Sequence, residues 1–433
     1  MSEPIYFLQL EIENYRCFKE KQVLDLSDGK GNWRKWTLIL GDNGTGKSSL
    51  LELLAAAEME EGKLSKEAEA YYSPKGYPFD ESKAHSGEYP ELFCKISLNI
   101  YWSPKNDYSE KIEYWLDYLS KDPSGMSIHY DKRLKELMCF GYGANRKMGT
   151  SSLAKSMNNN SETLFNDNAR LINAEEWLLQ LDYAASKDSE VKNFAIKKRE
   201  QVRQILIDLL PGIDNIRFTV PTKGNLKSTV EFKTPFEWVT IHQLSLGYKT
   251  MVAWMVDLAA RMFERYPNSD NPLAEPAIVL VDEIDLHLHP KWQRKIFDYL
   301  SDKFPQTQFI VTAHSPLVVQ SAPEGANIVL LRKENDQVII DTDLKSVQTW
   351  RVDQILTSDL FGLDSSRSIG TEKKLEERKS LLAKKNLSKE EKARLDELNA
   401  LADRLPIAYN FEDIEAMSIV QEAAEYLRNK KNK

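Results

Sequence analysis

The segment Gly41–Ser48, GDNGTGKS, constrains the fold of this chain more than any other feature. It fits the pattern G-x-x-x-x-G-K-[ST], follows the apolar run 36–41 and opens a helical stretch. In that context the pattern binds phosphate, because glycines let backbone N–H groups wrap the anion and the helix N-terminus adds partial positive charge. The sequence therefore predicts a nucleotide-binding α/β domain, with Lys47 against the phosphates and Ser48 holding Mg²⁺.

A pair of acids gives the second signal. Asp282 and Glu283 directly follow the run 277–281, AIVLV, which is continuous and apolar like a parallel strand buried on both faces. Carboxylates at the end of such a strand lie where α/β sheets bind ligands. Asp282 is predicted to reach the metal through water, and Glu283 to polarise the attacking water. Without the phosphate loop, the same pair would be interpreted as the cap of a strand.

Two further positions take their meaning from these motifs. Ser245 precedes a helix predicted from about Gly247, so its hydroxyl and the helix N-terminus form a second anion site. Alone, Ser245 is an ordinary helix N-cap. His314 closes the run 309–314, and neighbouring parallel strands would bring it to the same edge as the acids. Its imidazole is then expected to bond a γ-phosphate, although a lone histidine is more often structural.

Composition limits the remaining classes of protein. The net charge of −8 over 433 residues argues against a chain built as a whole to coat nucleic acid. No apolar stretch approaches the roughly 18 residues of a membrane span. The acidic N-terminus does not resemble a secretory signal, so we expect the cytoplasm and no membrane partner. Cys17, Cys94 and Cys139 are odd in number and scattered, which disfavours a disulfide framework or a zinc site.

Two clusters leave alternatives open. His287 and His289, beside Asp285, are consistent with a metal cluster or, preferably, with a turn that organises the nucleotide of a neighbouring subunit. A basic helix is consistent with nucleic-acid binding or, preferably, with a solvated face. Its members are Lys192, Lys197, Lys198, Arg199 and Arg203.

The motifs together resemble the ABC ATPases of the RecF, Rad50, SMC and OLD group. The resemblance rests on Gly41–Ser48 and on LEIENYRCF (10–18), LSLGYK (244–249), VDEIDLHLHP (281–290) and TAHSP (312–316). A narrower resemblance is to the ATPase subunit of Septu and its retron-associated relatives. That resemblance rests on FGYGANR (140–146), NAEEWLLQLDY (173–183) and RVDQILTSDLFGLDSSRS (351–368).

The resemblance implies an ATPase that uses ATP and Mg²⁺, with Glu283 and His314 in catalytic roles. It also implies a head-to-tail dimer, or an assembly of such dimers, in which Ser245 and Gly247 close on the phosphate loop of the other subunit. The resemblance also implies that Arg16 touches the nucleotide and that Arg146 acts near the γ-phosphate, the alternative for both being surface salt bridges. The phosphate-loop contacts are expected from Gly41, Asp42, Asn43, Gly44, Thr45, Gly46, Lys47, Ser48 and Ser49.

The expected fold class is α/β: an ABC ATPase head with a mixed or parallel sheet flanked by helices, an antiparallel β subdomain, an inserted helical lobe and a C-terminal helical hairpin. The expected divisions are 1–150, 151–215, 216–345 and 346–433. Ser388 and Glu391 form a capping box that begins the second hairpin helix. Leucines 375, 382, 395, 398 and 405 are expected to form the stripe of the hairpin. Segments 58–91 and 151–170 are expected to be loop and linker.

The sequence differs from parts of this family in ways that limit its possible functions. Leu246 replaces the second glycine of the transporter signature, and 198 positions separate Lys47 from Ser245 (245 minus 47), too few for long coiled-coil arms. We find no spaced acid cluster typical of a nuclease. The preferred hypothesis is a defence ATPase that controls a separate effector, an HNH nuclease, and meets nucleic acid through that complex. The alternatives are a RecF-like DNA-repair clamp and, least favoured, a transporter ATPase.

Overall fold

The computed structural model describes residues 4–13, 15–57, 59–60, 63–64, 93–102, 110–119, 126–129, 137–150, 160–224, 226–342, 347, 349–384 and 386–405. The chain divides into two compact units, Met1–Phe361 and Gly362–Lys433. None of the helices in the described ranges combines the length and apolarity needed to cross a bilayer.

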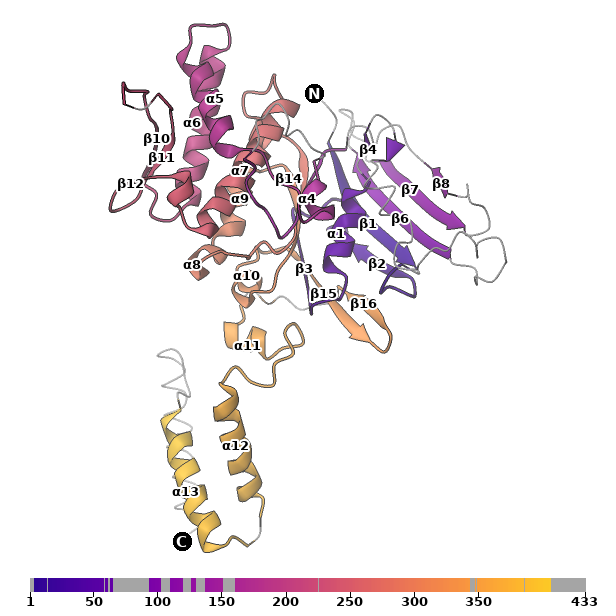
Figure 1. Cartoon of the computed structure of the whole chain (residues 1–433). Helices are drawn as coiled ribbons and strands as arrows, with labels where there is room; N and C mark the ends of the chain where they lie inside the picture. The colour runs from indigo at the N-terminus through magenta and orange to yellow at the C-terminus, as the bar shows by residue number, and fades with distance from the viewer. Residues whose placement is uncertain are drawn as a thin grey trace, which may run out of the picture. The chain divides into compact units, whose positions relative to one another are not determined.

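A six-stranded sheet forms the centre of the first unit (Figure 1). Its order is β16 (Gln337–Asp341), β15 (Asn327–Glu334), β3 (Trp36–Gly41), β14 (Thr307–Thr312), β13 (Ala277–Val281) and β9 (Cys139–Tyr142). All neighbours are parallel except β15 and β16. Every residue of β9, β13 and β14 is buried, which explains the continuous apolar sequence of β13.

The register of the sheet places the functional segments together. Val281 in β13 pairs with Val311 in β14, and Thr312 pairs with Ile39 in β3. The carboxyl ends of these three strands therefore meet at one edge. The phosphate loop leaves β3 there, the acid pair leaves β13, and His314 follows β14. The predicted convergence of these motifs is confirmed at the level of the backbone.

Two apolar cores cover the two faces of the sheet, since alternate strand residues point to opposite sides. Val279, Val281 and Val311 belong to the larger core, whereas Ile278, Leu280 and Ile310 belong to the smaller one. The larger core takes in α5 (Ala174–Ser186), α6 (Lys192–Leu209), α7 (Leu246–Arg265) and α9 (Ile296–Lys303). The smaller core takes in α1 (Lys47–Ala55) and β1 (Ile5–Glu13). Shorter helices α8 (Pro290–Gln293), α10 (Pro316–Gln320) and α11 (Val352–Leu356) complete the unit.

The antiparallel subdomain is a five-stranded sheet beside α1 (Figure 1). Its order is β2 (Gln22–Asp25), β1, β6 (Phe93–Trp102), β7 (Glu110–Leu119) and β8 (Met126–His129). A second antiparallel sheet, β10 (Asn215–Phe218), β11 (Val230–Lys233) and β12 (Trp238–Thr240), leads through the short 3-10 helix Ile241–Gln243 into α7. The predicted α/β class with an antiparallel subdomain and an inserted helical lobe is confirmed.

Two loop predictions need correction. Within the predicted loop 58–91, β4 (Met59–Glu60) and β5 (Lys63–Leu64) pair as a short hairpin. Within the predicted linker 151–170, α4 (Glu162–Phe165) is helical, and Leu164 is buried in the smaller core. Polar composition indicated loops because these elements are too short to show a periodic apolar pattern. The other residues of 58–91, and 151–159, lie outside the described part of the chain, and the four divisions remain predictions.

The second unit is the predicted helical hairpin, α12 (Ile369–Leu382) and α13 (Lys389–Arg404). The capping box is confirmed, because Ser388 Oγ accepts from the Glu391 N–H while the Glu391 carboxylate accepts from the Ser388 N–H. The leucine stripe is partly wrong: Leu398 is buried, but Leu382 is 55% exposed. Leu381 is buried in its place, since the heptad estimate was one residue out of phase at the helix end.

Candidate nucleotide site

The phosphate loop adopts a backbone that only glycine accommodates at its ends. Gly41 and Gly46 have φ values of 147° and 86°. A Cβ atom on Gly41 would lie 2.7 Å from the Leu331 carbonyl oxygen, and one on Gly46 would lie 2.7 Å from Cys17 Sγ. The two glycines therefore let the loop pack tightly against its neighbours.

Lys47 lies across the loop that precedes it. Its Nζ donates to the carbonyl oxygens of Gly41 at 2.7 Å and Asp42 at 2.9 Å. The residue is only 7% exposed, and burial lowers its pKa against the opposing charges of Asp282 and Glu283. The ammonium therefore lies within the loop, and its contact with the phosphates remains a prediction.

Ser48 and Asp282 meet across the edge of the sheet. Ser48 Oγ donates to Asp282 Oδ2 at 2.7 Å, and Thr312 Oγ1 donates to Asp282 Oδ1 at 2.6 Å. A serine hydroxyl beside a carboxylate is the oxygen donor set that Mg²⁺ takes next to nucleotide phosphates. The residues present therefore fit a Mg²⁺ ion. Thr312 was not predicted as a site residue, although it ends a buried strand that runs beside the strand of the acid pair.

Glu283 turns the chain out of β13. Its φ is 50°, a left-handed conformation that is uncommon for a residue other than glycine. Its N–H donates to Thr312 Oγ1 at 2.7 Å, and the next N–H, of Ile284, donates to the Thr312 carbonyl oxygen at 2.9 Å. The half-buried Glu283 side chain thus follows a fixed turn beside Asp282.

Arg146 is buried beneath this turn, with 2% of its surface exposed. It donates through Nη1 to the carbonyl oxygen of Asp282, and through Nη2 to that of Glu283 at 2.9 Å. Burial lowers its pKa to about 10, against the opposing charges of Asp282 and Glu283. The alternative interpretation of Arg146 as a surface salt bridge is therefore wrong.

Arg16 reaches the helix that follows the phosphate loop. Its Nη1 donates to Ser49 Oγ at 2.8 Å and lies 3.2 Å from Glu52 Oε2. Burial raises the pKa of Glu52 to about 7, although the neighbouring Arg16 lowers it in part. Arg16 therefore makes an ion pair with Glu52 and also lies beside the phosphate loop, because its partner Ser49 directly follows the predicted metal ligand Ser48.

The histidines lie along the same edge. The His314 N–H donates to the Asp285 carboxylate at 3.2 Å, and the His314 side chain is exposed. His287 has a φ of 64°, and His289 caps α8 by accepting from the Lys291 N–H at 3.3 Å. A capping role accounts for His289 without a metal, and His314 stands where a ligand at the edge can reach it.

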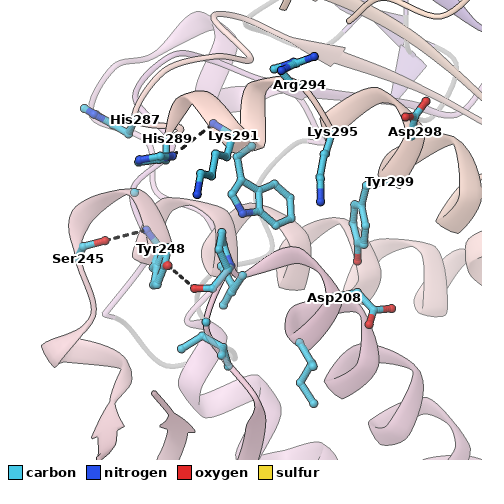
Figure 2. Close-up of a pocket in the computed structure, with 17 residues that line it drawn as sticks. Asp208, Ser245, Tyr248, His287, His289, Lys291, Arg294, Lys295, Asp298 and Tyr299 are labelled. Carbon is cyan, nitrogen blue, oxygen red and sulfur yellow. Dashed lines mark hydrogen bonds between the residues drawn. The ribbon is translucent and has the colours of Figure 1, made fainter. Parts of the chain in front are cut away.

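The signature segment, LSLGYK (244–249), contributes Ser245, Gly247 and Tyr248 to the lining of a cavity of about 1190 Å³ (Figure 2). Ser245 caps α7 by accepting from the Tyr248 N–H at 3.5 Å. A Cβ on Gly247 would lie 2.5 Å from the His287 carbonyl oxygen, so glycine is required for this close packing. Lys291 and Lys295 extend toward the cavity (Figure 2), and Trp292 also lines it. No described residue that lines the cavity belongs to the phosphate loop.

The basic helix α6 is largely neutralised. Lys197 pairs with Asp270 at 2.9 Å, Arg199 with Asp182 at 2.6 Å, and Arg203 with Glu200 at 2.6 Å. Lys198 is 1% exposed, and burial lowers its pKa to about 8. Lys192 lies 3.5 Å from Asp188. The preferred interpretation as a solvated face holds for its exposed members and is wrong for Lys198.

The sheet order, the phosphate loop after β3 and the acid pair after β13 define the nucleotide-binding head of an ABC-type ATPase. Two family models match the chain: "AAA domain" over residues 9–210, and "AAA domain, putative AbiEii toxin, Type IV TA system" over residues 152–320. Among solved structures, an Smc head bound to the C-winged helix domain of ScpA is similar with a TM-score of 0.46 and 16% identity, covering 78% of this chain and 97% of that chain.

Two known proteins are similar in sequence to this chain. "Septu protein PtuA" of Bacillus mycoides (strain KBAB4) is 29% identical over 361 residues, which are 82% of this chain and 44% of the relative. "Retron Vc95 probable ATPase" of Vibrio cholerae serotype O1 biovar El Tor is 39% identical over 132 residues, 30% of this chain and 25% of the relative. The chain is therefore similar to the Septu protein PtuA and to a retron ATPase. It spans less than half the length of these two relatives.

Proposed function

We propose that this chain binds ATP and hydrolyses it with Mg²⁺. The observation that carries the proposal is the contact of Ser48 Oγ with Asp282 Oδ2 at 2.7 Å, which joins the phosphate loop to the acid pair. Residues 234 positions apart thus bring together a hydroxyl and a carboxylate, which are oxygen groups of the kind that bind a nucleotide-bound magnesium ion directly or through water. Glu283, the next residue, then stands beside the point of attack.

Transfer of the γ-phosphate to water depends on positioning and charge neutralisation, and each side chain of the site has a separate role in it. Lys47 and the loop N–H groups bind the phosphates. Glu283 orients the water and accepts its proton, while exposed His314 hydrogen-bonds the γ-phosphate. Mg²⁺, held by Ser48 and Asp282, would neutralise charge that develops on the phosphate oxygens.

Removal of the metal tests this assignment. In excess EDTA the purified chain is expected to lose ATP turnover, because the phosphate charge is no longer neutralised. Adding Mg²⁺ back should restore phosphate release, measured by a coupled assay. The control is Lys47→Ala, which should show no turnover in either condition because nucleotide binding itself is weakened. Turnover that persists in EDTA would contradict the proposed use of Ser48 and Asp282.

The proposed functional form is a head-to-tail dimer, or an assembly of such dimers. Ser245 is exposed at the start of α7, beside a cavity to which the described phosphate-loop residues do not contribute. A helix N-terminus with an exposed hydroxyl can bind an anion supplied by another molecule. Facing subunits would therefore complete each nucleotide site with the Ser245 segment of the other.

We further propose that ATP-driven closure controls a separate effector in prokaryotic antiphage defence, an HNH nuclease. Support comes from relatives named for Septu and retrons, and from a hairpin that forms a compact unit of its own. Closure can bias a partner only if that partner contacts the open and closed states differently. A RecF-like DNA clamp is less well supported, since the cations of α6 are paired or buried.

Deletion of residues 370–405 tests the partner proposal. The intact chain with ATP and Mg²⁺ should cut neither DNA nor RNA alone, and cleavage should require a partner protein. The deletion should weaken partner binding or control while nucleotide affinity stays within about twofold, because the hairpin is a separate compact unit.

Binding can be measured by co-purification with a nuclease encoded beside the ATPase, and nucleotide affinity by titration. Cleavage by the pure chain that persists in Lys47→Ala would reveal a nuclease centre within it and overturn the proposal. An unchanged partner response after the deletion would exclude the hairpin as the docking surface.

A further inference from the structure

We propose that Arg146 is a positioning residue for hydrolysis, which holds the backbone of the acid pair in its active conformation and joins it to the signature helix α7. The inference rests on the proposed ATPase function. The family resemblance placed Arg146 at the γ-phosphate. The structure instead places its guanidinium behind the acids, where it contacts their backbone.

The backbone of Glu283 is held on both sides of its Cα atom. Its left-handed conformation, at φ 50°, is one that an L-residue adopts only when its surroundings impose it. Thr312 Oγ1 accepts the Glu283 N–H at 2.7 Å, and Arg146 Nη2 donates to the Glu283 carbonyl oxygen at 2.9 Å. The peptide groups on both sides of the Glu283 Cα are therefore fixed, which determines where its side chain begins.

The carboxylates of Asp282 and Glu283 differ in how they are held. The Asp282 carboxylate is held directly by the hydroxyls of Ser48 and Thr312. Within the described residues, no hydrogen bond to the Glu283 carboxylate is found, so its position depends on its backbone. Loss of Arg146 should therefore disturb Glu283 more than Asp282. It should impair water activation more than binding of the metal–nucleotide complex.

The planar guanidinium of Arg146 bonds several acceptors at once. Arg146 Nη1 also donates to the Gly143 carbonyl oxygen at 3.2 Å, so one side chain joins three carbonyl groups from two segments. A planar fork of donors can do this, whereas the single ammonium of lysine cannot reach all three in the same geometry. The buried charge is balanced by Asp282, Glu283 and Asp285, which all favour the protonated form.

Arg146 also contacts a residue of α7. Arg146 Cζ lies 5.5 Å from the ring centroid of Trp254, whose side chain is fully buried within that helix. The same helix is capped by Ser245. The guanidinium thus lies between the turn of the acid pair and the helix that starts at the signature. A shift of α7 when Ser245 engages a second subunit would act on the acid pair through this contact.

Steady-state kinetics of Arg146→Ala and Arg146→Lys test the proposal. We expect kcat to fall by roughly 10²-fold for Arg146→Ala, since a small misplacement of a reacting group has an effect of that size. KM and Mg²⁺–ATP affinity should change by no more than about twofold, because Lys47 and Asp282 keep their own partners. Arg146→Lys should recover little of the loss. Arg217→Ala, which removes an exposed arginine paired with Glu231, is the matched control and should keep the parent kcat.

Chemical rescue separates positioning from general stabilisation. Guanidinium chloride in the low millimolar range should raise the kcat of Arg146→Ala in a saturable manner, because the truncated side chain leaves a cavity of matching shape. Equal concentrations of sodium chloride should not, and Glu283→Gln should not respond to guanidinium. Should Arg146→Ala fail to fold, Arg146→Lys carries the kcat and KM measurement.

The outcomes distinguish this inference from the proposed function. A wild-type chain without ATP turnover would overturn both. A wild-type chain that turns over ATP, with an Arg146→Ala variant of equal kcat, would overturn only the role of Arg146. A folded variant whose loss lies in KM alone, or that guanidinium does not rescue, would likewise exclude a positioning role.

Discussion

Glu283→Gln is expected to bind ATP like the parent chain and to hydrolyse it roughly 10²-fold or more slowly, because the general base for the attacking water is lost. The substitution keeps the size of the side chain. The contacts that fix the turn, from Thr312 and Arg146, are made to the Glu283 backbone and remain available. Single-turnover phosphate release and nucleotide titration together separate hydrolysis from binding.

Glu324→Gln is the matched control, since Glu324 is exposed in the turn before β15. The first residue of β15 pairs with Thr37 near the start of β3, whereas the phosphate loop follows the end of β3. It should hydrolyse ATP at the parent rate. If Glu283→Gln also hydrolysed ATP at the parent rate, the assignment of Glu283 would be wrong. A variant that lost binding and hydrolysis together would assign Glu283 to binding the nucleotide.

The second large effect is expected from mixing two inactive subunits. Lys47→Ala removes the phosphate-loop cation, and Ser245→Arg places a bulky side chain at the start of α7. Each variant alone should have almost no turnover, since every site of its homodimer carries a lesion. A mixed dimer would contain one site with both lesions and one site with neither. ATPase activity should therefore reappear in the mixture.

The mixture must be shown to contain mixed dimers, for example by tagging the two subunits differently and purifying on both tags. No recovered activity in such dimers would count strongly against a shared site. Recovery would not be expected if each chain completed its own site. Ser245→Ala serves as a milder control, because it removes the hydroxyl without adding a side chain that blocks approach.

Much of the fold followed from local patterns. The runs at 36–41, 277–281 and 309–312 are apolar without alternation because their strands are covered on both faces. The glycine pattern at 41–48 predicted the turn, since its backbone requires positive φ at Gly41 and Gly46. Short elements were missed or misplaced, because a four-residue helix or a two-residue strand contains too few positions to show a period.

The sequence alone determined the class of fold, the order of the motifs and the residue types at the nucleotide site, since each is encoded within a few neighbouring residues. Beyond the metal ligands Ser48 and Asp282, which the motifs already placed together, only the tertiary structure decided which distant groups meet. Thr312 contacts the acid pair, and Arg146 contacts the carbonyl oxygens behind it. An arginine that bonds carbonyl groups 136 and 137 positions away leaves no local pattern. Its partners are backbone atoms that every residue carries, so chain packing alone selects them.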